Sequence, residues 1–300
     1  MFSMKSAALC FLWNLRMLGK NLRFYLGLLL GFLICFFLTE KTISLAQAFR
    51  TDIQFFEPFI WCFADGNSVL FASLALLMPL SQIPRLDAPT SYLILRSGRK
   101  SWFLGQIITI LSISMLYTVF LLLCTSLMTV GNVFFDNCWS DTATVMSFAP
   151  QQFDVALTVV RRTVKQTDPY SCAASIFFLM AQYMLFLSLV SLVVSLQFGK
   201  QAGISAVIGI SLYSYLLTPS RFETWLGLDE QIKYIANLLA AWMSPLQHAT
   251  YTMHSFGYDS LPTFVQTHIL MGSVNLVLIL LSMWSVHRMQ FSFGKGEQYV

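Results

Sequence analysis

Charge is what this sequence has least of. Only 11% of its 300 residues are charged, whereas 56% are hydrophobic and 15% are aromatic. A soluble domain carries roughly 25% charged residues, so this chain has too few of them to cover a surface that faces water. Its net charge of +4 is also too small to indicate a polyanionic partner. The composition excludes a soluble enzyme, a disordered tail and a nucleic-acid-binding module, and it indicates an all-α integral membrane protein.

The motifs of common active sites are also absent. No C-x-x-C pair, H-E-x-x-H, G-x-S-x-G or G-x-x-x-x-G-K-[ST] phosphate loop occurs, and the four histidines lack the spacing of paired metal ligands. We therefore predict that the chain is not an enzyme and that it holds no catalytic residue, cofactor or metal of its own. Cys138 and Cys172 flank one loop, where they either form a disulfide or remain two separate thiols.

Long apolar segments predict six transmembrane helices. A helix needs roughly 20 apolar residues to cross a bilayer. The segments that meet this requirement are 24–39, 67–83, 103–130, 173–196, 203–218 and 267–286. The first is short, so residues from Thr39 onward are expected to extend its helix above the membrane. Ile235–Met243 is too short to cross and precedes Ser244 and Pro245, which predicts a re-entrant or interfacial segment before the last helix.

The positions of basic residues predict the orientation. Cytoplasmic loops of membrane proteins are enriched in lysine and arginine. With both termini cytoplasmic, the inner segments hold eleven basic residues, namely Lys5, Arg16, Lys20, Arg23, Arg85, Arg96, Arg99, Lys100, Lys200, Arg288 and Lys295, but only two acidic ones, Asp87 and Glu297. We therefore expect a multi-pass protein of the cell membrane with both ends inside. Ala46-Gln47-Ala48 resembles a signal-peptide cleavage site, but the charged leader and the neighbouring Glu40 and Lys41 argue against cleavage.

Two cytoplasmic segments are predicted to form helices. Residues 1–23 place their basic side chains on one side and apolar ones on another, as in an amphipathic helix that lies on membrane lipid; a simple basic anchor is the alternative. A short helix is predicted over 88–96, capped by Asp87 and ended by Ser97-Gly98. It is either a lever between two spans or an ordinary basic loop. The domain division is 1–23, a six-helix membrane domain over 24–287, and a cytoplasmic tail over 288–300.

The predicted spans contain no Asp or Glu. Carriers driven by protons or sodium usually need an ionisable residue within the membrane, so the energy for any transport is expected to come from outside this chain. A secondary carrier or a channel is thus disfavoured, the channel also because no charged or carbonyl-rich filter pattern occurs. A scaffold subunit of a membrane complex stays open as a second alternative.

The assembled features resemble the membrane subunit of a type-2 ABC exporter, a family of six-helix bacterial permeases. The segment Tyr92–Trp102 (YLILRSGRKSW) is similar to the basic, glycine-containing stretch that leads into the third span of such permeases. Met243–His248 (MSPLQH) is similar to their Ser-Pro-Leu element before the final helix, and Gln197–Gln201 to their tight second inner turn. The likeness covers nearly the whole chain, through the order of its elements.

This resemblance implies partners and site residues. The family pairs two membrane subunits, identical or different, with cytoplasmic ATPases that bind ATP and Mg²⁺. The resemblance places ATPase coupling at Tyr92, Arg96, Arg99 and Lys100, and the pathway or subunit interface at Ala72, Ser73, Leu76, Ala206, Gly209 and Tyr213. A wall of small and apolar side chains favours an amphipathic or hydrophobic cargo such as a peptide, a lipid-like molecule or a drug, because a charged ion would have no partner there.

Overall fold

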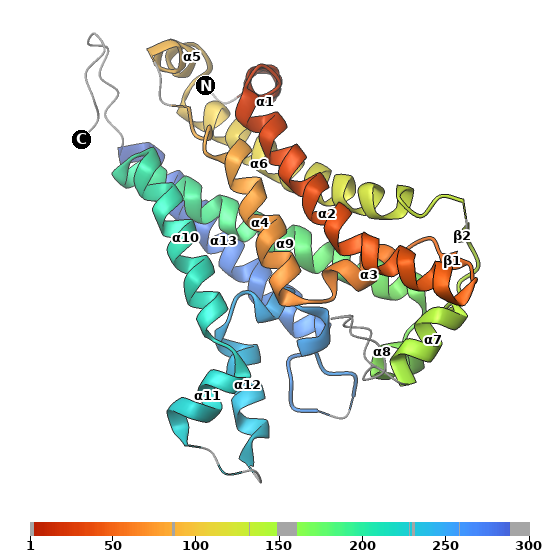
Figure 1. Cartoon of the computed structure of the whole chain (residues 1–300). Helices are drawn as coiled ribbons and strands as arrows, with labels where there is room; N and C mark the ends of the chain where they lie inside the picture. The colour runs from red at the N-terminus through yellow and green to blue at the C-terminus, as the bar shows by residue number, and fades with distance from the viewer. Residues whose placement is uncertain are drawn as a thin grey trace.

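The computed structural model describes residues 3–85, 88–131, 133–148, 161–227, 229, 232–257 and 259–288. Most of this part of the chain is helical (Figure 1). The α-helices are α1 (Met4–Leu18), α2 (Leu22–Phe49), α3 (Glu57–Phe63), α4 (Gly66–Leu80), α5 (Ala88–Ser97), α6 (Arg99–Leu127), α7 (Asp141–Phe148), α8 (Arg161–Gln166), α9 (Pro169–Phe198), α10 (Lys200–Leu216), α11 (Pro219–Leu226), α12 (Tyr234–Met243) and α13 (Phe264–Arg288). The expected all-α class is confirmed.

The long apolar helices are those of a multi-pass membrane protein. Four of them, α2, α6, α9 and α13, are long and apolar enough to cross a bilayer. Two bent pairs, α3 with α4 at 90° and α10 with α11 at 68°, bring the number to six if each pair is one span. Every predicted span coincides with one of these helices, and α2 continues beyond residue 39 to Phe49, as the expected extension of the first helix. Ala46-Gln47-Ala48 therefore lies inside a continuous helix.

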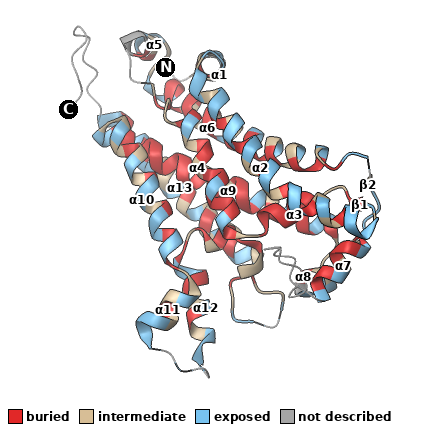
Figure 2. Ribbon diagram, in the orientation of Figure 1, coloured by how far each residue is buried: buried red, intermediate tan, exposed pale blue. Residues whose placement is uncertain are grey.

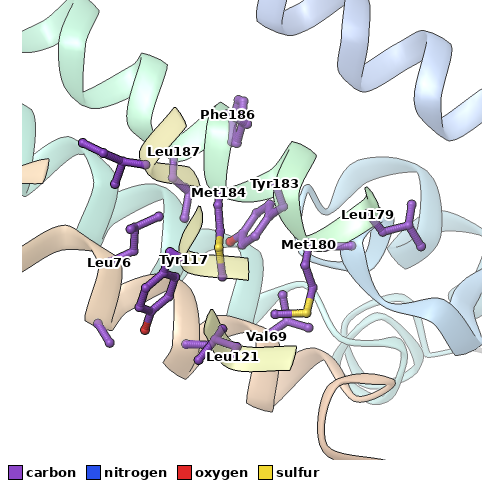
Figure 3. Close-up of a cluster of buried hydrophobic side chains, with 14 of the residues drawn as sticks. Val69, Leu76, Tyr117, Leu121, Leu179, Met180, Tyr183, Met184, Phe186 and Leu187 are labelled. Carbon is purple, nitrogen blue, oxygen red and sulfur yellow. The ribbon is translucent and has the colours of Figure 1, made fainter. Parts of the chain in front are cut away.

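Helix α9 forms the centre of the bundle. In its most apolar window 78% of the residues are buried, against 22% in α2 and 28% in α13. Figure 2 shows this contrast as a mostly red α9 among helices with pale outer faces. Its core side chains, among them Met180, Tyr183 and Leu187, meet Leu76 of α4 and Tyr117 of α6 (Figure 3). Helices α4, α6, α10 and α13 all contact α9, so α9 is the element that the other helices share.

Helix α1 packs against α6 through a face of small residues. Ala7, Cys10 and Asn14 are buried there, and a Cβ atom added to Gly105 of α6 would lie 2.7 Å from the Cβ of Cys10. The Asn14 amide donates a hydrogen bond of 3.0 Å to Thr109 Oγ1. The sequence pattern predicted this helix, and the contact with α6 adds a buried face that the pattern did not identify. A buried hydrogen-bonded asparagine ties α1 into the bundle.

The two ends of the bundle differ in charge and in structure (Figure 1). At one, which we call the basic end, lie α1, α5, the start of α6, the α9–α10 turn and the end of α13. The described basic residues predicted to be cytoplasmic are all in these segments or in the adjoining start of α2 and residue Arg85. The other, which we call the loop end, carries α7, α8, α11, α12 and the only strands among the described residues, β1 (Ile53–Gln54) and β2 (Val133–Phe134), which pair in parallel.

A buried carboxylate joins two segments of the loop end. Glu57 is fully buried at the start of α3, and its oxygens accept hydrogen bonds from the backbone N–H and the hydroxyl of Ser140, at 2.6 and 2.7 Å. It lies outside the predicted spans, as expected, but its burial was not predicted. Because both oxygens are paired with Ser140, this carboxylate connects α3 to the segment before α7.

The segment before α13 folds back into the bundle at the loop end. After α12 it forms two short 3₁₀ helices, η3 (Gln247–Ala249) and η4 (Tyr251–Met253). The imidazoles of His248 and His254 both lie within hydrogen-bond distance of Thr267 Oγ1, at 3.3 and 3.0 Å, and His254 stacks on Phe264. Burial lowers the pKa of His254 to about 4 and also lowers that of His248. Both histidines therefore stay neutral at pH 7.

Candidate functional site

Helix α5 is held on the basic end by its buried side and by the turn that follows it. Ile94 is buried, and its carbonyl accepts a hydrogen bond of 2.8 Å from Gly98 N. Gly98 has φ of 82°, a left-handed conformation that favours glycine, and it begins α6. Trp102, one turn further, is fully buried. The local sequence thus fixes where α5 ends and how α6 starts.

Hydrogen bonds between helices brace the basic end. Arg99 Nη1 donates to the carbonyl oxygen of His287 at the end of α13, at 2.8 Å. Arg85 Nη2 donates to the carbonyl oxygen of Met17 in α1, at 3.2 Å. The side-chain amide of Gln197 donates to Ser285 Oγ, at 2.9 Å. These hydrogen bonds connect α6 to α13, the residues after α4 to α1, and α9 to α13, while α5 itself packs against α6 and α1.

The outward side of α5 combines apolar and basic side chains. Tyr92 and Leu95 are 66% and 67% exposed, and Arg96, Arg99 and Lys100 are exposed beside them. We call these five residues the α5 surface. The four predicted coupling residues all belong to it, and Leu95 is the member that the sequence reasoning missed. Its place on the helix, three residues after Tyr92, is the signal that could have identified it. The predicted cap, Asp87, lies outside the described residues.

The predicted pathway residues of α4 lie inside the chain. Ala72, Ser73 and Leu76 are at most 1% exposed, and the Ser73 hydroxyl donates to the carbonyl oxygen of Leu70 at 2.7 Å. Leu76 belongs to the core around α9 (Figure 3). In this conformation the three side chains fill the bundle and do not line a surface.

The predicted pathway residues of α10 lie on its outer side. Tyr213 is 47% exposed, Gly209 is exposed with no atom within 4 Å of an added Cβ, and Ala206 is half-buried. The face of α10 that packs against α9 contains Gly203 and Val207 instead. The structure therefore does not bring the α4 and α10 residues together on one surface. It leaves the α10 residues accessible to a partner.

The described residues contain no cluster of His, Cys, Asp and Glu side chains suited to a metal ion. All six cysteines are free thiols, with Cys138 exposed and Cys172 buried, so the disulfide considered from sequence is not formed here.

Comparison of the chain with models of known protein families, with curated proteins and with solved structures finds no match. The assignment of a function consequently depends on the surfaces and packing described above together with the sequence resemblance.

Proposed function

We propose that this chain is the membrane subunit of an ATP-driven ABC exporter, with the basic end in the cytoplasm and a separate ATPase bound to the α5 surface. The observation that carries the proposal is the bracing of α5. A helix that transmits force must be exposed on one side and rigidly attached on the other, and α5 combines the exposed Tyr92 with the buried Ile94 and the Gly98 turn. The excess of basic residues at this end supports its cytoplasmic location.

The outer face of α10 supports a second element of the proposal, the pairing of two membrane subunits. Gly209 leaves room for a close approach, and small residues let transmembrane helices pack closely. The cargo would then pass beside apolar walls, which suits a peptide, a lipid-like molecule or a lipophilic drug. Because Ala72, Ser73 and Leu76 are buried here, α4 would have to move to reach the pathway.

The test is site-specific photo-cross-linking in membranes of the native host. Tyr92→benzoylphenylalanine should capture a protein with an ATP-binding phosphate loop, identified by mass spectrometry. Trp225→benzoylphenylalanine is the matched control, because Trp225 is 61% exposed on α11 at the loop end. Capture of an ATPase from position 92 and not from 225 supports the proposal. Capture of other membrane proteins alone at position 92 would favour the scaffold alternative.

A charge reversal then tests coupling. Arg96→Glu is the cleanest variant, because Arg99 also holds the end of α13 and its loss would disturb the bracing. We expect Arg96→Glu to lower ATPase co-purification about tenfold, the effect of losing roughly 1.4 kcal/mol of binding free energy. Lys41→Glu, an exposed reversal on α2, should leave it unchanged. Equal recovery with Arg96→Glu and the unaltered chain would place the contact elsewhere, with the Phe198–Lys200 turn as the next candidate.

A further inference from the structure

A cavity of about 570 Å³ lies between α6, α9 and α13. This volume is typical of sites for small ligands. Its walls are mostly apolar, with Leu111 and Met115 from α6, Phe178 and Leu185 from α9, and Leu276 from α13. Leu111, Phe178 and Leu276 are also exposed on the outside of the bundle, so the cavity opens where lipid would surround the helices. It shares no residue with the α5 surface or with the predicted pathway residues.

Four polar side chains interrupt this apolar wall, namely Ser114 of α6, whose hydroxyl lies 3.5 Å from that of Ser188, Gln182 of α9, and His268 and Asn275 of α13. Gln182 of α9 and His268 of α13 pair twice, because the glutamine amide donates to the His268 carbonyl oxygen at 3.1 Å while its Oε1 lies 2.7 Å from His268 Nδ1. Since Oε1 can only accept, Nδ1 must carry the proton. A neutral His268 therefore presents Nε2 as a hydrogen-bond acceptor.

Asn275 supplies a second acceptor. It is only 5% exposed and lines the cavity, and its amide Nδ2 donates to the Gln182 carbonyl oxygen at 3.5 Å. Its Oδ1 has no hydrogen-bond partner in the structure. A buried polar atom without a partner is destabilising, so a ligand that supplies a donor here would be stabilised. Asn275 is seven residues after His268, about 10 Å further along α13.

We propose that this cavity binds a hydroxylated lipid, that is, an apolar molecule dissolved in the membrane whose alcohol group donates a hydrogen bond to Asn275 or His268. Both protein groups are acceptors, which favours a donor over an ether or an ester. Asn275 lies near the middle of α13, at a depth that suits a mostly apolar molecule better than a charged headgroup. The site is independent of the proposed ATPase and of α10.

Gly272 is the wall residue of this cavity at which a larger side chain can be introduced. An added Cβ at Gly272 would meet only the Gln182 amide, at 3.7 Å, so a methyl group fits while a large side chain would extend into the cavity. Gly272→Phe therefore fills the site without a clash of backbones. Ser273→Phe is the matched control, because Ser273 is exposed, adjacent on the same helix and not part of the cavity wall.

The experiment uses the full chain in phosphatidylcholine nanodiscs. One probe is a long-chain fatty alcohol with a mid-chain diazirine, and the other is its methyl ether, which has the same apolar body but no donor. Cross-linked peptides are quantified by mass spectrometry. We expect the alcohol to label α6, α9 and α13 about five- to tenfold more than the ether does, the ratio that one hydrogen bond of about 1–1.4 kcal/mol gives. This comparison needs no variant.

The variants separate the two parts of the proposal. Asn275→Leu should lower alcohol labelling toward the ether level, and Gly272→Phe should lower labelling by both probes, whereas Ser273→Phe should change neither. Equal labelling by alcohol and ether in the unaltered chain would overturn the recognition of a donor. If Gly272→Phe changes the oligomeric state of the chain but leaves the labelling unchanged, this face contacts a second copy of the chain. That result would overturn the lipid site.

Discussion

Helices α4 and α10 both contain small residues and both contact the central helix α9. The small residues of the two helices differ in their surroundings. On α4 the residues Ala72 and Ser73 are buried in the bundle. On α10 Gly203 is buried against α9, while Gly209, less than two turns away, faces outward. Small residues allow a close approach by another helix, but the comparison shows that they do not say whether that helix belongs to the same chain.

The largest effect is expected from a contrast between two glycines of α10. An added Cβ at Gly203 would lie 2.7 Å from the carbonyl oxygen of Ser191, a backbone atom that cannot rotate away, whereas at Gly209 it meets nothing within 4 Å. Gly203→Leu should lower the free energy of unfolding by about 3 kcal/mol or more. Gly209→Leu should change it by less than about 1 kcal/mol. Unfolding in mixed detergent micelles measures both, and similar losses would remove the distinction between the two faces.

The second contrast is between two leucines. Leu76 of α4 is 1% exposed and Leu212 of α10 is 57% exposed. Leu76→Ala leaves a cavity in the core around α9 and should cost about 3 kcal/mol. Leu212→Ala should cost less than about 0.5 kcal/mol. A cost for Leu76→Ala as small as that for Leu212→Ala would mean that α4 leaves the core easily, which would support its participation in a pathway.

The sequence predicted the long apolar helices well, because each is an apolar run of bilayer length bounded by a Gly, a Pro or a charge, but it did not predict the short α3, α7, α8 and α11. Gly98 and Gly199, both at positive φ, directly follow the last residues of α5 and α9. The sequence did not predict which distant segments pair with one another. The contact of Asn14 with Thr109, and that of Glu57 with Ser140, join residues more than 80 positions apart, and no local pattern specifies such partners.

The candidate site was predictable to the same extent. The α5 surface is contiguous in sequence, so the short helix was predicted from its turn residues, and the resemblance named four of the five residues, with Leu95 missed. The cavity lined by Gln182, His268 and Asn275 was not, because its polar groups, with Ser114, come from three helices, α6, α9 and α13, that are distant in the sequence. Only the packing of these three helices against one another brings them together.

The stability of the loop end is expected to depend on pH, and this effect is smaller than those of the substitutions above. Burial lowers the pKa of His254 to about 4, so its neutral form stabilises the fold. That stabilisation is complete above pH 6.5, the usual pKa of histidine, and is lost as the pH falls toward 4. We expect the loop end to lose about 2 kcal/mol over this range, measured by hydrogen exchange of residues 244–257.

His254→Gln removes the titrating group and should flatten this pH dependence, although it lowers the stability at pH 7. His287→Gln is the control, since His287 is exposed at the basic end. If acid sensitivity between pH 6.5 and 4 persists unchanged in His254→Gln, His254 is not its source.

The smallest effect on folding, and the most informative for function, is expected at the outer face of α10. Gly209→Cys in a Cys138→Ser background should form a disulfide between two copies of the chain in native membranes, because a paired interface would bring the two α10 helices together. Leu280→Cys, on the exposed side of α13, should not.

Gly209→Trp should leave the monomer folded, since nothing lies within 4 Å of an added Cβ, but should prevent pairing and with it the proposed export. Cross-linking at position 280 and not at 209 would move the subunit interface to α13, and would also place it beside the cavity that we assign to a hydroxylated lipid.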